Sequence, residues 1–116
     1  MVGIGIDIIE VSRIKKIINS KGVRFLKRIF TDKEILYCSS KTNKYERFSG
    51  RFAAKEAVKK ALSKRIQVSF KEIEILNDDE GLPFVEIKNN SYGEITMHIS
   101  ISHISEYATS IAIAEN

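Results

Sequence analysis

The sequence predicts an α+β domain, in which helices pack on a largely antiparallel sheet. Three observations lead to this fold class. The first residues alternate as a strand, the middle of the chain has the periodicity of one long helix, and the second half alternates as strands joined by short turns. The length of 116 residues predicts a single domain that covers 1–116.

The first strand, over residues 2–9, has two unlike faces. Its alternating residues are Val2, Ile4, Ile6 and Ile8 on one side and Gly3, Gly5 and Asp7 on the other. Because the glycine side has almost no side chains, another part of the chain is expected to approach it closely.

Three short helical segments are expected next. Apolar spacing predicts a helix over 11–19 and, after a glycine, a second one over 23–29. Thr31 and Glu34 stand at capping-box spacing, which predicts the start of a third helix that ends near Cys38.

The longest predicted helix runs from about Asn43 to Leu62. Small residues share one arc of it: Gly50, Ala53, Ala54, Ala57 and Ala61. A second stripe begins with aromatic residues and ends in a carboxylate and an ammonium: Tyr45, Phe48, Phe52, Glu56 and Lys60. The small arc can lie close against a backbone, and the glycine side of the first strand is the natural partner.

The second half reads as antiparallel strands. Segments 72–77 and 84–88 flank a turn at 78–81, and 94–102 alternates cleanly between apolar and polar residues. A last strand is expected over 107–114, with a small-residue face that matches the long helix.

Composition and charge narrow the class of protein. No apolar run reaches the roughly 18 residues that cross a membrane, and no basic leading region marks a signal peptide. A cytoplasmic globular protein is therefore expected. Cys38 is the only cysteine, which excludes an intrachain disulfide and predicts a small buried side chain. With only two histidines beside it, no zinc site is expected.

Basic residues gather near the amino terminus. Between Arg13 and Arg28 there are seven basic residues and no acidic one. Such a run attracts nucleic acid, a membrane surface or an acidic protein, or it is simply a solvated helix face.

Three charged residues are the first candidates for chemistry. A carboxylate on a core strand is costly unless it is paired or binds a metal, so Asp7 calls for a partner. If the glycine side of the strand packs on the helix, Asp7 and Glu56 lie near one site. Two carboxylates there could bind Mg²⁺, which completes its coordination shell with water and substrate phosphates. Lys60 forms either a surface pair with Glu56 or a phosphate contact, and the pattern alone does not choose between them.

Two other readings fail. Gly3 and Gly5 do not complete a dinucleotide-binding motif, since residue 8 is isoleucine and no βαβ unit follows. Ser102 and His103 are adjacent and would point to opposite sides of a strand, so hydrogen bonding to a ligand or turn chemistry is favoured over nucleophilic catalysis.

Three segments together resemble one family. GIGIDIIEVSRI at the start is similar to the opening motif of holo-acyl-carrier-protein synthases, which belong to the 4'-phosphopantetheinyl transferases. RFAAKEAVKKAL is similar to their second motif, and SISHISEYATSIAIAE to their closing hairpin. One departure is Leu82, where the family commonly has a basic residue between glycine and proline; a contact of that residue with coenzyme A would be lost here.

The resemblance implies roles for particular residues. Asp7 and Glu56 match the magnesium-binding acids, and Lys60 matches a lysine near the phosphates of coenzyme A and the reacting centre. Further coenzyme A contacts are implied for Arg51, Ser102 and His103, with Arg51 and His103 near the nucleotide and its 3'-phosphate. The surface for an acidic acyl carrier protein is implied to include Arg13, Arg24, Phe25 and Arg28. Family members are usually homotrimers with active sites shared between subunits.

The implied reaction transfers 4'-phosphopantetheine from coenzyme A to a serine of apo-acyl carrier protein and releases adenosine 3',5'-bisphosphate. Either Glu56 or a water held by the metal would accept the serine proton. The competing hypothesis is a small basic module that binds nucleic acid without catalysis. It accounts for the basic run but not for Asp7 and Glu56, and Phe25 is the only aromatic residue within that run.

Overall fold

The computed structural model describes residues 2–63, 66–88 and 95–116 of the chain. Its elements in chain order are β1 (Val2–Glu10), α1 (Val11–Lys21), α2 (Val23–Ile29), α3 (Asp32–Ser39), α4 (Lys44–Leu62), the short 3-10 helix η2 (Phe70–Glu72), β2 (Ile73–Asn77), β3 (Pro83–Ile87), β4 (Thr96–His103) and β5 (Tyr107–Glu115). The α+β class is confirmed, and the expected elements are present with ends shifted by a few residues at most. Glu94, which was expected to open a strand, lies outside the described residues.

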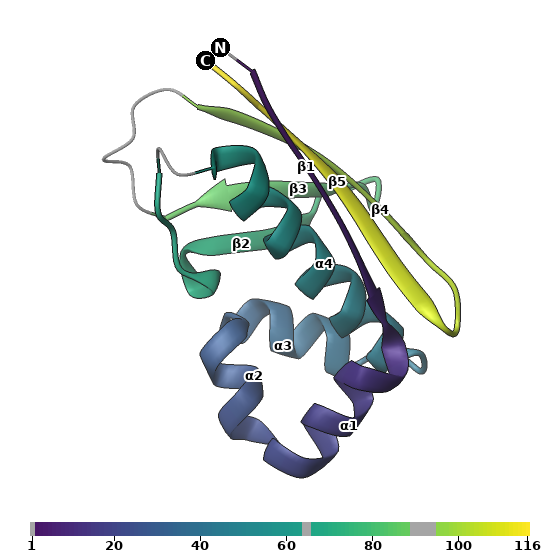
Figure 1. Ribbon diagram of the computed structural model, residues 1–116. Coiled ribbons are helices and arrows are strands. Elements are labelled where there is room, and N and C mark those ends of the chain that lie inside the picture. The colour runs from purple at the N-terminus through teal and green to yellow at the C-terminus, as the bar shows by residue number, and fades with distance from the viewer. Residues whose placement is uncertain (1, 64–65, 89–94) are drawn as a thin grey trace.

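The strands form two antiparallel sheets where one was expected. The larger sheet has the order β1-β5-β4, and the smaller one pairs β2 with β3. In the larger sheet Asp7 lies opposite Ser110, and Val2 lies opposite Glu115, so the two ends of the chain are neighbours (Figure 1). Between the larger sheet and the group formed by α1, α2 and α3 runs α4, which contacts all three strands of that sheet (Figure 1).

The main core forms where α4 meets the sheets. The small arc predicted on this helix is buried: Gly50, Ala53, Ala54, Ala57 and Ala61. A Cβ on Gly3 would lie 1.9 Å from the carbonyl oxygen of Ala61, and one on Gly5 would lie 2.0 Å from that of Ala57. The close approach inferred from the glycines of the first strand is therefore confirmed.

A second core lies under the short helices. Its buried residues are Ile14, Ile29, Phe30, Cys38 and Phe48. The capping box predicted at the start of α3 is complete, because Thr31 N donates to Glu34 Oε1 (2.8 Å) and Glu34 N donates to Thr31 Oγ1 (3.4 Å). Burial raises the pKa of the Cys38 thiol to about 12, which keeps it neutral and unreactive.

The outer face of the larger sheet is apolar and uncovered. Ile4, Ile6 and Ile8 are each more than 60% exposed, and Ile111 on the neighbouring strand is 41% exposed. A continuous exposed patch of branched aliphatic side chains is typical of a protein–protein interface. None of the described helices combines the length and the apolar character that crossing a membrane demands.

The close contact between β1 and α4 predicts that replacing a glycine there by alanine lowers the unfolding free energy more than the same replacement elsewhere. Gly5→Ala places Cβ against a backbone oxygen that cannot move without shifting α4, so a loss of about 3 kcal/mol or more in unfolding free energy is expected. The measurement is urea unfolding followed by circular dichroism.

Gly50→Ala is the matched control. Its added Cβ meets side-chain atoms and no backbone, Ile101 Cγ2 at 3.1 Å and His103 Cδ2 at 3.9 Å. These can shift, and alanine favours the helix by about 1 kcal/mol. Its stability should stay near that of the unmodified chain. Equal losses in the two variants would contradict the close-approach argument.

Candidate active site

Asp7 and Lys60 meet at the edge of the β1–α4 contact. Lys60 Nζ donates to the carbonyl oxygen of Ile6 (2.8 Å) and lies 3.2 Å from Asp7 Oδ1. The Asp7 side chain is 17% exposed and that of Lys60 52%, so the pair opens to solvent on one side. Thr109 Oγ1 donates to the carbonyl oxygen of Asp7 (2.8 Å), which fixes the strand at this point.

Glu56 lies one helical turn before Lys60 on α4 and is half-buried. Within the described residues its carboxylate has no hydrogen-bond or ion-pair partner. It is therefore free to bind a ligand or to accept a proton. Because Lys60 touches Asp7 and shares a helix face with Glu56, the three predicted catalytic residues belong to one region of the surface.

The donor atoms in this region suit a hard cation. In the described parts of the chain no three His, Cys, Asp or Glu side chains gather into a metal-binding group. Two carboxylates are nevertheless what Mg²⁺ commonly takes from a protein, with water and substrate phosphates completing its shell. Asp7 and Glu56 thus fit a magnesium ion that is shared with a phosphorylated substrate.

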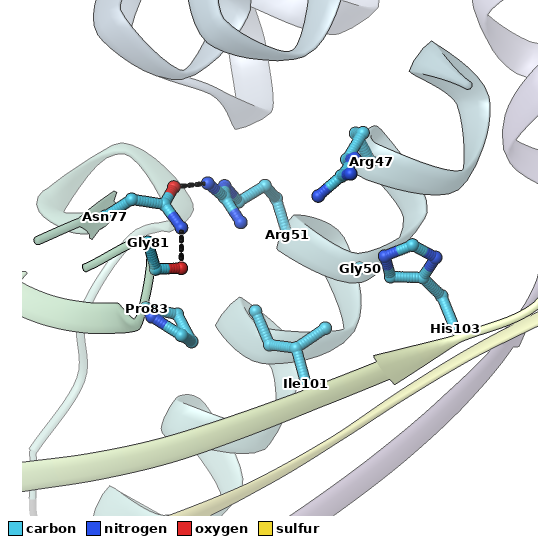
Figure 2. Close-up of a pocket in the computed structure, with 8 residues that line it drawn as sticks. All are labelled: Arg47, Gly50, Arg51, Asn77, Gly81, Pro83, Ile101 and His103. Carbon is cyan, nitrogen blue, oxygen red and sulfur yellow. Dashed lines mark hydrogen bonds between the residues drawn. The ribbon is translucent and has the colours of Figure 1, made fainter. Parts of the chain in front are cut away.

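A second polar region is a pocket between α4, the β2–β3 turn and β4, with a volume of about 160 Å³ (Figure 2). Its lining residues are Arg47, Gly50, Arg51, Asn77, Gly81, Pro83, Ile101 and His103. Arg51 is only 5% exposed, donates from Nη2 to Asn77 Oδ1 and lies over the Tyr37 ring. The structure therefore brings Arg51 and His103 together in one cavity.

Ser102 does not share this cavity. β4 continues through His103, so Ser102 faces outward on the exposed side of the sheet while His103 faces inward. His103 Nδ1 lies 3.0 Å from Glu46 Oε1. The opposed orientation expected for these neighbours is confirmed, and a direct serine–histidine pair is excluded within this chain.

The predicted docking residues are placed by α1 and α2. Arg24, Phe25 and Arg28 line a hollow of about 360 Å³ together with Ile17 and Lys21. Arg13, the fourth predicted docking residue, is exposed on α1 but does not line this hollow. A hollow lined by both apolar and basic side chains suits an acidic partner that also presents apolar residues.

A buried polar network supports α4 from the side opposite β1. Lys55 is fully buried, and its Nζ lies 2.7 Å from Glu34 Oε1 and 2.9 Å from the carbonyl oxygens of Ile29 and Phe70. Glu34 Oε2 also accepts from the backbone N–H of Ile75 (2.8 Å). Burial lowers the pKa of Lys55, while the charge of Glu34 opposes that shift.

Sequence reasoning missed this network and two residues of the pocket. Nothing in the sequence distinguishes Lys55 from the other lysines of its helix. The capping box already accounts for Glu34, so no buried ion pair is predicted. Arg47 and Asn77 carry no local pattern at all. Only the fold shows that these four residues face inward or line a cavity.

The chain is similar to known proteins over nearly its whole length. A family model described as the 4'-phosphopantetheinyl transferase superfamily matches residues 3–112. The holo-[acyl-carrier-protein] synthase of Halothermothrix orenii is 42% identical over 97% of this chain and 96% of that protein. The synthase of Chlamydia trachomatis serovar D is 49% identical over 99% of this chain and 100% of that protein.

A solved structure shows the same likeness in three dimensions. The crystal structure of Helicobacter pylori holo-[acyl-carrier-protein] synthase in complex with coenzyme A has a TM-score of 0.86 to this chain. The two sequences are 32% identical, and the matched region covers 97% of this chain and 99% of the Helicobacter pylori chain.

The buried ion pair generates a stability prediction. Lys55→Met leaves the carboxylate of Glu34 buried without its cation, so a loss of about 3–5 kcal/mol in unfolding free energy is expected. Glu34→Gln should also destabilise the chain, and the double variant should lose at least about 1 kcal/mol less than the two single losses added together. Urea unfolding of all four proteins measures this coupling.

Lys71→Met is the control for loss of a lysine. Lys71 is exposed and belongs to none of the ion pairs among the described residues, so its removal should cost less than about 1 kcal/mol. Strict additivity of Lys55→Met and Glu34→Gln would show that the two charges do not support each other.

Proposed function

The chain belongs to the 4'-phosphopantetheinyl transferase superfamily, and on that premise we propose that it is a holo-[acyl-carrier-protein] synthase. It transfers 4'-phosphopantetheine from coenzyme A to a serine of apo-acyl carrier protein, which supplies active carrier for fatty acid synthesis. The observation that carries the proposal is the contact of Lys60 with Asp7, which joins the two motif-bearing elements β1 and α4 at one charged edge.

In this reaction the serine hydroxyl attacks the β-phosphorus of coenzyme A. The bond from that phosphorus to the bridging oxygen breaks, and adenosine 3',5'-bisphosphate leaves. Lys60 can neutralise charge that develops on the phosphate oxygens, because its ammonium is half exposed and already oriented by Ile6 and Asp7.

Magnesium is part of the proposal, with Asp7 and Glu56 as its protein ligands. When bound, the ion supplies charge neutralisation and orientation at the pyrophosphate. We assign acceptance of the serine proton to this same acidic edge, where Glu56 has a carboxylate without a partner among the described residues.

Docking of the acidic carrier is assigned to the basic surface on α1 and α2. Arg24, Phe25 and Arg28 border its hollow, and Arg13 extends the positive charge along α1. Charge of this kind speeds encounter and fixes orientation more than it adds affinity. The rate of transfer should accordingly fall as salt screens the surface.

We also propose a homotrimer and a cytoplasmic location. The uncovered isoleucines on the outer face of β1 and β5 support self-association, because such a face loses contact with water when subunits pack. The cytoplasm is where coenzyme A and newly made carrier proteins are available together.

The proposal predicts metal-dependent modification of a carrier. Apo-acyl carrier protein incubated with the chain, coenzyme A and Mg²⁺ should gain the mass of one phosphopantetheine, and EDTA should abolish the gain. Asp7→Asn and Glu56→Gln should each slow transfer by on the order of a hundredfold or more. Intact-protein mass spectrometry over a time course measures the rate.

Glu86→Gln is the matched control, since it neutralises an exposed carboxylate on β3 and should leave the rate unchanged. Transfer at full rate in EDTA would contradict the metal assignment. Absence of transfer to several apo-carriers by a folded protein would contradict the proposed activity itself.

Reversing one charge on the docking surface should affect one substrate only. For Arg24→Glu we expect the KM for the carrier to rise by about tenfold, while the KM for coenzyme A stays the same, because the reversed charge repels the acidic partner. Steady-state kinetics with each substrate varied in turn measures both constants.

Lys71→Glu, an equal charge reversal at an exposed site outside the hollow, controls for the change in net charge. If the two reversals raise the KM for the carrier equally, or if Arg24→Glu raises both constants alike, the assigned docking surface is wrong.

A further inference from the structure

Lys55 and Glu56 are neighbours on α4, and their side chains leave the helix in different directions. Lys55 is fully buried, whereas Glu56 is half-buried at the proposed metal site. The Lys55 ammonium has three donor hydrogens and three acceptors: Glu34 Oε1 at 2.7 Å and the carbonyl oxygens of Ile29 and Phe70 at 2.9 Å each. The ammonium is therefore held in one position.

The carbonyl group of Ile29 is the link to the docking surface. Ile29 is the last residue of α2, and Arg28, which lines the docking hollow, directly precedes it. The last carbonyl groups of a helix have no partner within the helix, so a lysine that reaches one of them stabilises that end. Arg28 and Glu56 are thus connected by one hydrogen bond between their immediate neighbours.

The short helix η2 contacts the same part of α4. The carbonyl oxygen of Phe70 accepts from Lys55, and its ring stacks on that of Phe52 with the ring centres 5.6 Å apart. Lys59 Nζ lies 3.9 Å from the centre of the same Phe70 ring. Because Phe52 lies one turn before Glu56 and Lys59 lies about one turn after it, α4 is held against η2 on either side of that carboxylate.

Glu34 attaches this cluster to two further elements. Its Oε1 also accepts from the backbone N–H of Thr31 (2.8 Å) at the start of α3, and its Oε2 accepts from that of Ile75 (2.8 Å) on β2. A movement of α2 relative to α4 would therefore break hydrogen bonds of a buried charge, which is costly. The contact resists even small displacements of α2.

Resting on the proposed function, we propose that Lys55 is a positioning residue, which sets the place of the carrier-docking helix α2 relative to Glu56. A carrier bound at Arg24, Phe25 and Arg28 then presents its serine hydroxyl to the acidic edge. Such placement matters, because a displacement of about 1 Å can slow a reaction about a hundredfold. Since Lys55 is fully buried, it acts through these two elements and not on a substrate directly.

The test separates the rate of transfer from binding. For Lys55→Met we expect the single-turnover rate at saturating carrier to fall by at least about tenfold, because the serine is misplaced. The KM for the carrier and the affinity for Mn²⁺ in the presence of coenzyme A should each change by less than about threefold, since the docking hollow and the β1–α4 contact remain. Rapid-quench mass spectrometry measures the rate, and isothermal titration calorimetry measures Mn²⁺ binding.

Glu34→Gln is the matched control for lost stability. It removes the ion pair but leaves Lys55 its two carbonyl acceptors, so the rate per folded protein should fall by less than about threefold although the protein is destabilised. Lys71→Met removes an exposed lysine of η2 and should change neither the rate nor the affinities. Circular dichroism shows whether each variant is folded.

The double variant Lys55→Met/Glu34→Gln replaces Lys55→Met if the single variant does not fold, because it leaves neither charge of the pair buried alone. The same loss of rate is expected for it, since the bond to the end of α2 is again absent.

Transfer at the full rate by folded Lys55→Met, or by the folded double variant, would overturn this inference and leave the proposed function standing. Equal losses of rate in Lys55→Met and Glu34→Gln would also overturn it, because a general loosening of the chain would then explain both. A loss of Mn²⁺ affinity as large as the loss of rate would overturn it too, since the fault would lie in the metal site. Absence of transfer by the unmodified chain would instead overturn the proposed function.

Discussion

The packing of α4 against β1 is the constraint on which the candidate site depends. With no side chain at Gly3 and Gly5, the backbone oxygens of α4 occupy space that a Cβ would need. At that separation the ammonium of Lys60 reaches both the β1 backbone and Asp7. A bulkier residue in the strand would push the helix away and separate the two elements that supply the acids. The glycines therefore set the distance at which Lys60 of α4 meets Asp7 of β1.

The opposite side of α4 is held by charge. Lys55 ties this helix to the end of α2, to η2 and to Glu34 of α3, and Glu34 in turn accepts from β2. The contacts of Gly3 and Gly5 set how close α4 lies to the larger sheet. The Lys55–Glu34 ion pair limits the rotation of α4 about its own axis. Since Glu56 follows Lys55 directly, fixing one inward side chain also fixes the direction of its neighbour toward the β1 side.

Local patterns predicted the elements well, because strand alternation, helical spacing and the Thr31–Glu34 capping box are properties of neighbouring residues. The close approach of β1 and α4 could also be predicted, since both partners have small faces. Arg47 and Asn77 could not be placed, because the pocket exists only where α4, a hairpin and β4 meet. The resemblance implies a coenzyme A contact for both Ser102 and His103, whereas strand alternation predicts that the two face opposite sides, as the structure confirms. The split into two sheets likewise depends on long-range packing.

Locating the metal tests the proposed site most directly. A crystal of the chain grown with coenzyme A and Mn²⁺, which accepts the same oxygen ligands as Mg²⁺, would show the ion by its anomalous scattering. We expect one strong peak within coordination distance of the Asp7 and Glu56 carboxylates and of the coenzyme pyrophosphate. Bound coenzyme with no peak there, or a peak held by other residues, would contradict the claim that the β1–α4 contact builds the catalytic metal site.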